Sequence, residues 1–102
     1  MYNRNDLEAV AQAIICPDNS EAMTLEYFLR KLTDPDGEIA YGLRVDKRQQ
    51  KGVLVEREET TALTRSLADI TAMAKAFAAG SVPPCVLIEM VDEWHEVMFE
   101  KA

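Results

Sequence analysis

The apolar residues near the start of the chain recur at the spacing of a helix. Within residues 5–16 they fall on one stripe, formed by Leu7, Val10, Ala11, Ile14 and Ile15. Asn5 is placed for an N-cap, and Pro17 would end the helix because it excludes the helical conformation from the residue before it. The pattern therefore predicts an N-terminal helix, followed by a short linker.

The middle of the chain changes to strict alternation, which is typical of β-strands. Residues 23–32 and 38–46 both place their apolar side chains at odd positions. Opposite residues of an antiparallel pair share a face of the sheet, so an odd residue must pair with an odd residue. A loop over 35–37 meets this condition, since it pairs Leu29 with Leu43. The same loop pairs Tyr27 with Val45 and places Gly37 where a type I turn with a G1 bulge needs positive φ.

A third strand is predicted over residues 53–61, after a turn within 47–52. Val53 and Val55 continue the odd apolar face, but Arg57 and Glu59 interrupt it. We therefore expect this strand to be apolar only at its beginning and to end near a rim of the sheet.

Two helices are predicted to complete the chain. The stripe of the first consists of Leu63, Leu67, Ile70, Ala74 and Phe77. Thr64 is its predicted N-cap and Gly80 its C′ residue. The second helix begins at Pro83 and Pro84, because proline is favoured in a first helical turn. Its stripe consists of Leu87, Met90, Val91, Trp94 and Met98.

These elements predict an α+β fold with the order α-β-β-β-α-α. A three-stranded antiparallel meander has its odd-numbered face covered by the two C-terminal helices. Residues 1–102 are expected to form one domain, in which 1–20 are a helical arm with its linker and 21–102 are the meander with the helical pair.

The charge of the chain argues against several classes of partner. With 102 residues and a net charge of −7, the chain lacks the basic surplus that binds nucleic acid or anionic membranes. It contains no apolar run of the ~18 residues that a membrane span needs. We therefore expect a cytoplasmic protein in which Cys16 and Cys85 are free thiols.

The cysteine and histidine of the last predicted helix do not form a catalytic pair. Cys85 and His95 are ten positions apart, which is roughly 15 Å along a helix axis. No catalytic residue, cofactor or resident metal is predicted. An alternative is a weak metal site, a small-ligand site or an enzyme centred on His95, Asp92 and Glu96.

In the absence of catalytic chemistry, the sequence favours a non-enzymatic protein-interaction or regulatory module that binds a protein partner or forms a homodimer. The predicted interaction surface consists of Leu7, Val10, Ile14, Met90, Trp94, Met98, Glu89, Glu93 and Glu96. A further alternative is an acidic regulator, in which the glutamates of the last helix bind a basic partner.

Four segments also carry a resemblance to a family. They are "YFLRK", "YGLRV", "LTRSLADITAMAKAF" and "GSVPPCVLIEMVDEW", in the last three quarters of the chain. They resemble a small, uncharacterised Firmicutes family of about this length, which is a domain of unknown function. The resemblance implies no catalytic residue, since no activity is assigned to that family.

Overall fold

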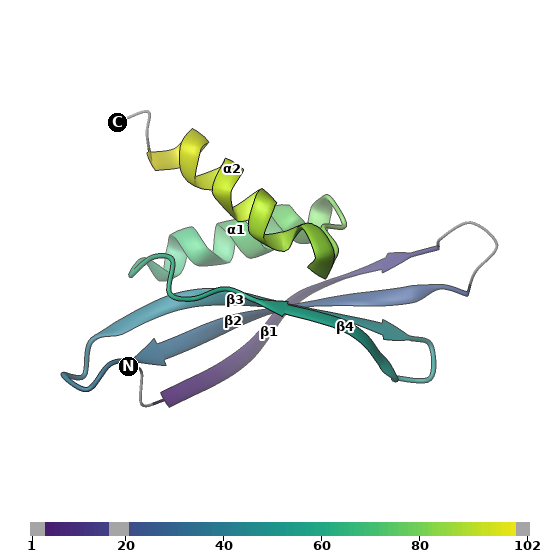
Figure 1. Ribbon diagram of the computed structural model, residues 1–102, viewed down its shortest axis with the longest axis horizontal. Coiled ribbons are helices and arrows are strands. Elements are labelled where there is room, and N and C mark those ends of the chain that lie inside the picture. Colours follow the sequence, from purple (N-terminus) through teal and green to yellow (C-terminus); the bar gives the residue numbers. More distant parts are fainter. Residues whose placement is uncertain (1–3, 17–20, 100–102) are drawn as a thin grey trace.

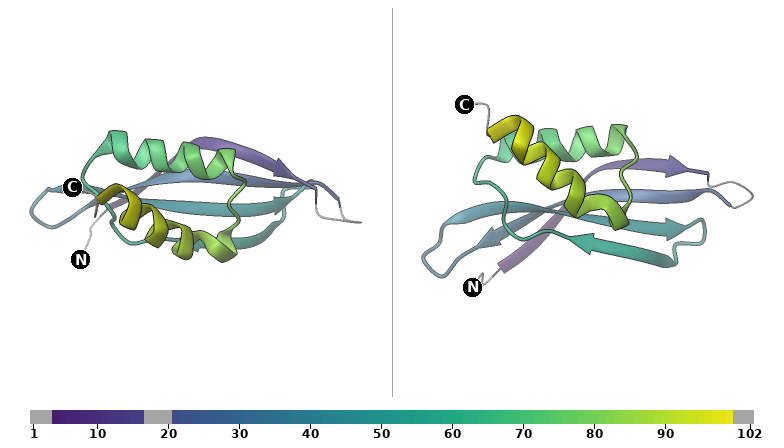
Figure 2. Two further views of the ribbon diagram at one scale, coloured as in Figure 1. Left: turned by 90° about the horizontal axis from the view of Figure 1, so that it is seen from above. Right: turned by 45° about the horizontal axis from the view of Figure 1, so that its top comes forward.

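A computed structural model describes residues 4–16 and 21–99 of the chain. Its elements are β1 (Arg4–Ile15), β2 (Met23–Thr33), β3 (Ile39–Gln49), β4 (Leu54–Glu59), α1 (Leu67–Ala79), a short 3-10 turn η1 (Pro84–Val86) and α2 (Leu87–Phe99). The strands form one antiparallel sheet in the order β1-β2-β3-β4. Both helices lie on the same face of this sheet (Figures 1 and 2), which we call the covered face. The opposite face is called the open face.

The predicted N-terminal helix is wrong, because residues Arg4–Ile15 form β1 and pair with β2. The sheet therefore has four strands instead of three, and β1 belongs to it instead of forming a helical arm. A β-bulge between Ala9 and Ala11 explains the misleading pattern. A bulge inserts one residue and so reverses the parity of the side chains that face the core. The β1 side chains that pack against the core are Val10, Ala11, Ala13 and Ile15.

The hairpin between β2 and β3 is confirmed residue by residue. Leu29 pairs with Leu43, and Tyr27 pairs with Val45. At the turn, the amide of Gly37 donates to the carbonyl oxygen of Asp34 at 3.0 Å, and Gly37 has φ of +87°. Parity of the apolar residues was thus sufficient to fix both the register and the loop length.

The third predicted strand corresponds to β4, and its apolar residues do not continue the core face as expected. The register shifts between Lys47 and Arg48, where β3 pairs with β4. Val53 and Val55 are 56% and 46% exposed, so the prediction that they continue the apolar face is wrong. The strand is short, and four of its six residues are charged.

The core lies between the covered face and the two helices. Its buried strand residues are Leu25, Tyr27, Leu29, Leu43 and Val45, and its buried helical residues are Ile70, Met73, Ala74, Phe77, Leu87 and Val91. The hydroxyl of Tyr27 donates to the carbonyl oxygen of Val82 at 2.8 Å. This bond ties the middle of the sheet to the loop between the helices. Within residues 4–16 and 21–99, no helix is long and apolar enough to cross a membrane.

The helix ends differ from the predicted caps. Ser66 is the N-cap of α1, since its hydroxyl accepts from the amide of Asp69 at 3.1 Å. Thr64 instead forms a bridge to Tyr41 of β3. At the other end Gly80 has φ of −91°, and Ser81 is the residue with positive φ. The chain after the paired prolines is helical, as predicted.

Candidate functional site

The open face of the sheet carries a network of charged side chains. Strand alternation places even-numbered residues of β2 and β3 on this face, because their odd-numbered neighbours lie in the core. Arg57 and Glu59 of β4 pair with even residues of β3 and share the face. We call Arg30, Arg44, Arg48 and Arg57 the arginine cluster. Four of the six arginines in the chain therefore lie together.

Asp46 is the centre of this network. Its carboxylate accepts two hydrogen bonds from Arg44, both at 3.0 Å, and two from Arg57, at 2.8 and 3.2 Å. Arg48 adds a fifth at 3.3 Å. The side chain of Asp46 is 0% exposed, although strand alternation places it on the face opposite to its core neighbour Val45. The aliphatic and guanidinium parts of the arginines therefore form the layer that buries it.

Burial alone would raise the pKa of Asp46, because a charged carboxylate is poorly solvated in the interior. The hydrogen bonds and charges of Arg44 and Arg57 outweigh burial and lower the pKa from 3.8 to about 2. The hydrogen bond to Asp46 in turn raises the pKa of Arg57. At neutral pH Asp46 is thus a fixed negative charge that holds the guanidinium groups in place.

The remaining contacts extend the network to β2 and to the chain after β4. Arg48 Nε donates to Glu26 at 2.9 Å, and Arg44 lies over the ring of Phe28 at 5.3 Å. Arg30 donates to the carbonyl oxygen of Thr60. Its Nε lies 3.4 Å from Glu59 without hydrogen-bond geometry, so among the described residues this buried nitrogen has no hydrogen-bond partner.

A glycine allows the chain to cross the open face next to Arg30. A Cβ atom on Gly42 would lie 2.5 Å from the carbonyl oxygen of Thr61, which is closer than real Cβ contacts come. The hydroxyl of Thr60 accepts from the amide of Leu43 at 2.9 Å. Gly42 therefore lets Thr60 and Thr61 pack directly on β3 and close that end of the network.

The outer edge of β1 is a second candidate surface. β1 pairs with β2 on one side only, so it ends the sheet. Its residues from Ala9 to Ile15 include no charged side chain. Leu7 and Ile14 are 40% and 66% exposed. The strand thus offers unpaired backbone groups beside exposed apolar side chains, which is the arrangement that promotes strand pairing.

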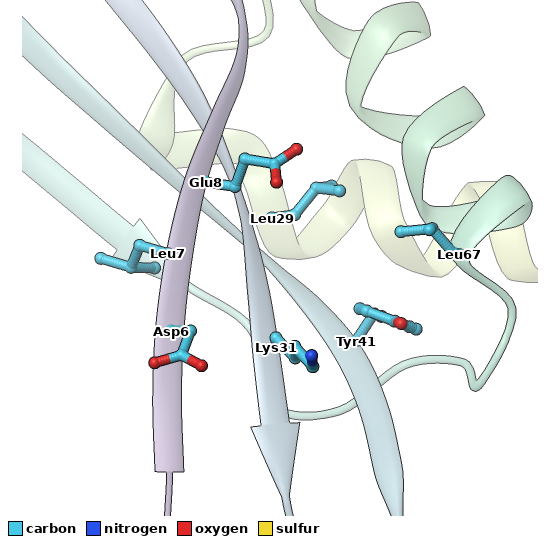
Figure 3. A pocket seen from close by; sticks show the side chains of 7 residues that line it. All are labelled: Asp6, Leu7, Glu8, Leu29, Lys31, Tyr41 and Leu67. Atoms are coloured by element: carbon cyan, nitrogen blue, oxygen red, sulfur yellow. The ribbon is translucent and has the colours of Figure 1, made fainter.

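A shallow depression lies on the covered face between β1 and the start of α1 (Figure 3). Its volume is about 340 Å³, and it is lined by Asp6, Leu7, Glu8, Leu29, Lys31, Tyr41 and Leu67. Most of these residues are exposed. Small-molecule sites bury most of the surface of their ligand, so this depression gives little support to a ligand site.

The structure separates the residues of the predicted interaction surface. Leu7, Val10 and Ile14 belong to β1, where Val10 packs against the core and the other two are exposed. Met90 and Trp94 are partly buried against the core, and Trp94 meets Phe77 edge-on at 5.8 Å. Glu89 and Glu93 are exposed on α2. The side chains of Glu96 and Met98 lie outside the described part of the chain.

The alternative metal site centred on His95, Asp92 and Glu96 lies near the end of α2. Asp92 is exposed on α2, and the side chain of His95 lies outside the described part. Among the residues whose side chains the structure describes, no three of the types His, Cys, Asp and Glu are grouped to hold a metal ion. Cys16 and Cys85 are both exposed free thiols, as expected.

Sequence reasoning missed Asp46 and the arginine cluster, although a signal was present. The predicted register already placed Glu26 opposite Asp46 and Phe28 opposite Arg44. Two acidic groups opposite each other repel unless cations lie between them. The neighbouring arginines at positions 44 and 48 supply those cations. Charge complementarity across the predicted hairpin could therefore have identified the network.

Fold and site together define a class: an α+β protein with a four-stranded antiparallel meander, two helices on one face and an ion-pair network on the other. The chain belongs to the family described as "Family of unknown function (DUF6514)", whose model matches residues 8–97. Membership of an uncharacterised family was predicted and is confirmed; the match also includes most of β1. No curated protein and no solved structure matches the chain.

Proposed function

We propose that this protein is a non-enzymatic interaction module that forms a homodimer through the outer edge of β1. The observation that carries the proposal is the difference between the two outer strands. β4 has six residues, and four consecutive ones are charged, from Glu56 to Glu59. β1 has twelve residues, and those from Ala9 to Ile15 are uncharged. Charges and short length protect an edge strand from pairing, and this part of β1 has neither protection.

The bulge indicates which part of β1 pairs. A bulge twists an edge away from a flat partner, so Ala9 and Val10 are poorly placed for continuous pairing. From Ala11 to Ile15 the register with β2 is unbroken. This segment has the regular backbone on which another strand can add hydrogen bonds.

A second copy of the chain fits this segment when the two strands run antiparallel. A twofold axis near Ala13 places the uncharged segments opposite each other and keeps Asp6 and Glu8 of each copy away from the same residues of the other. A parallel arrangement would place those acidic residues opposite their counterparts, which is destabilising. The antiparallel contact also closes on itself, as most homodimers do, and it continues the sheet from one copy to the other.

Light scattering after size-exclusion chromatography tests the proposal. The wild-type protein is expected to show a concentration-dependent species of about twice the 11.5 kDa chain mass. Ile14→Lys should shift it to the monomer, because a lysine at an exposed edge position opposes strand pairing. Ile14 is 66% exposed in the single chain, so the variant should fold.

Ile88→Lys is the matched control. Ile88 is 46% exposed and belongs to α2 instead of the sheet, so this variant should keep the dimer. A wild-type protein that stays monomeric at high concentration would refute the homodimer. Equal loss of the dimer in both lysine variants would place the contact somewhere other than β1.

A further inference from the structure

The charged groups of the arginine cluster differ in how deeply they are buried. Its acceptor Asp46 is 0% exposed, whereas the side chains of Arg48 and Arg57 are 31% and 36% exposed. Solvent therefore meets guanidinium groups above the buried carboxylate of Asp46, together with the carboxylates of Glu26 and Glu59, whose side chains are 31% and 37% exposed. Among the described residues the four arginines face three carboxylates, Asp46, Glu26 and Glu59, so this surface keeps an excess of one positive charge (4 − 3) in a protein of net charge −7.

The guanidinium groups also keep unused hydrogen-bonding capacity. Within the described part of the chain the four arginines donate eight hydrogen bonds. That is fewer than half of the N–H donors that four guanidinium groups carry. The bonds to Asp46 fix the orientation of Arg44 and Arg57, so little side-chain freedom is lost when a ligand binds.

From these observations we infer that the open face is a docking surface for an acidic segment of a partner protein. Aspartate or glutamate side chains of that segment bind Arg48 and Arg57, since carboxylates match the planar fork of a guanidinium group. Recognition of acidic motifs by clustered arginines is an established mode of peptide binding.

The neighbouring side chains favour a protein segment over a nucleic acid. Leu54 is opposite Arg48 in the sheet and is 38% exposed, and Phe28 lies beside Arg44. An acidic peptide with apolar residues can use both kinds of contact. A long polyanion would instead meet the repulsion of the whole chain, which lacks the cationic surplus that counterion release requires.

The acidic helix does not cancel this attraction. Glu89, Asp92 and Glu93 are exposed on α2, and Figure 1 shows α2 on the far side of the sheet from the open face. Solvent-exposed charges are screened over about 8 Å at physiological ionic strength. The outer edge of β1 is not part of the docking surface, so the acidic segment is expected to bind whether or not the homodimer forms.

Fluorescence anisotropy with a labelled peptide of glutamate and leucine residues tests the inference. The wild-type protein should bind this peptide and leave a matched peptide of lysine and leucine unbound. Arg48→Gln and Arg57→Gln should each weaken binding about tenfold, because each removes a charge-assisted hydrogen bond. Arg57→Lys should restore part of the affinity, since it keeps the charge and loses the fork.

Arg65→Gln is the matched control, because Arg65 is 73% exposed and pairs with Glu38 outside the cluster. It should bind the peptide as the wild type does, and circular dichroism checks that all variants are folded. The inference is overturned by three results: no binding to the wild type, equal weakening in Arg65→Gln, or equally tight binding of a single-stranded oligonucleotide of the same charge.

Discussion

The two faces of the sheet both bury side chains completely, but they do so with different chemistry. On the covered face Leu25 and Val45 are 0% exposed beneath two helices. On the open face Asp46 is also 0% exposed, yet both described helices lie on the opposite face of the sheet (Figure 1). Hydrophobic packing excludes water from the first face, and arginine side chains exclude it from the second.

This difference shows that one face of a sheet can be covered by helices, while the other face is covered by long side chains. The stems of Arg44 and Arg57 act as the missing layer, while their charged ends remain near water. Such a layer can also receive a partner, because its outermost groups are polar donors. The apolar core has no comparable role, since its side chains are enclosed.

The largest expected effect concerns the covered face. Leu43→Ala should lower the free energy of unfolding by about 3 kcal/mol, because Leu43 is 1% exposed and its removal leaves a cavity. Urea unfolding monitored by circular dichroism measures the change. Leu54→Ala on β4 is the control and should cost less than about 1 kcal/mol, since Leu54 is 38% exposed. Equal losses would contradict the contrast between the faces.

The contribution of the open face to the free energy of unfolding should depend on pH. In the folded state the pKa of Asp46 is about 2, below its ordinary value of 3.8. A lowered folded pKa gives stability that is fully present above the unfolded pKa and is lost as pH falls through the folded pKa. The contribution of Asp46 should therefore disappear between about pH 5 and about pH 2, and it amounts to about 2 kcal/mol.

Urea unfolding at both ends of this pH range tests the role of Asp46. Asp46→Asn should be less stable than the wild type at neutral pH, because three arginines lose a charged partner. It should also lack the part of the acid-induced loss that Asp46 causes. The same acid-induced loss in wild type and variant would show that other carboxylates control the pH dependence.

Most of the fold followed from the sequence where pattern and topology agreed. The odd parity of the β2 and β3 apolar residues fixed their register, and the paired prolines marked the start of the last helical segment. The prediction failed at β1, because the bulge between Ala9 and Ala11 produces apolar spacing that also suits a helix. Helical spacing over a short segment is therefore ambiguous when β-branched residues such as Val10 and Ile14 are present.

The candidate surfaces were predicted less completely than the fold. Leu7 and Ile14 were predicted to belong to an interaction surface on a helix, whereas both lie on the strand β1. The arginine cluster was missed, although the predicted β2–β3 register already placed Glu26 opposite Asp46; only Arg57 joins the cluster through the β3–β4 register. Side chains on an uncovered face give no periodic apolar signal, so their role depends on cross-strand neighbours and not on position in the sequence.

The smallest expected effect concerns the one described hydrogen bond from Tyr27 to Val82, 2.8 Å long, beneath the helices. Tyr27→Phe should lower the free energy of unfolding by about 1 kcal/mol at neutral pH, because the carbonyl oxygen of Val82 loses its buried donor.

Burial also raises the pKa of Tyr27 from 10.0 to about 12. A raised folded pKa gives stability that is present below pH 10 and is lost as pH rises toward 12. The wild type should therefore approach the stability of Tyr27→Phe in alkali, and urea unfolding at about pH 7 and about pH 11 measures the approach. A constant difference between the two proteins would mean that the phenol ionises as easily in the folded chain as in the unfolded chain, which would contradict its enclosure on the covered face.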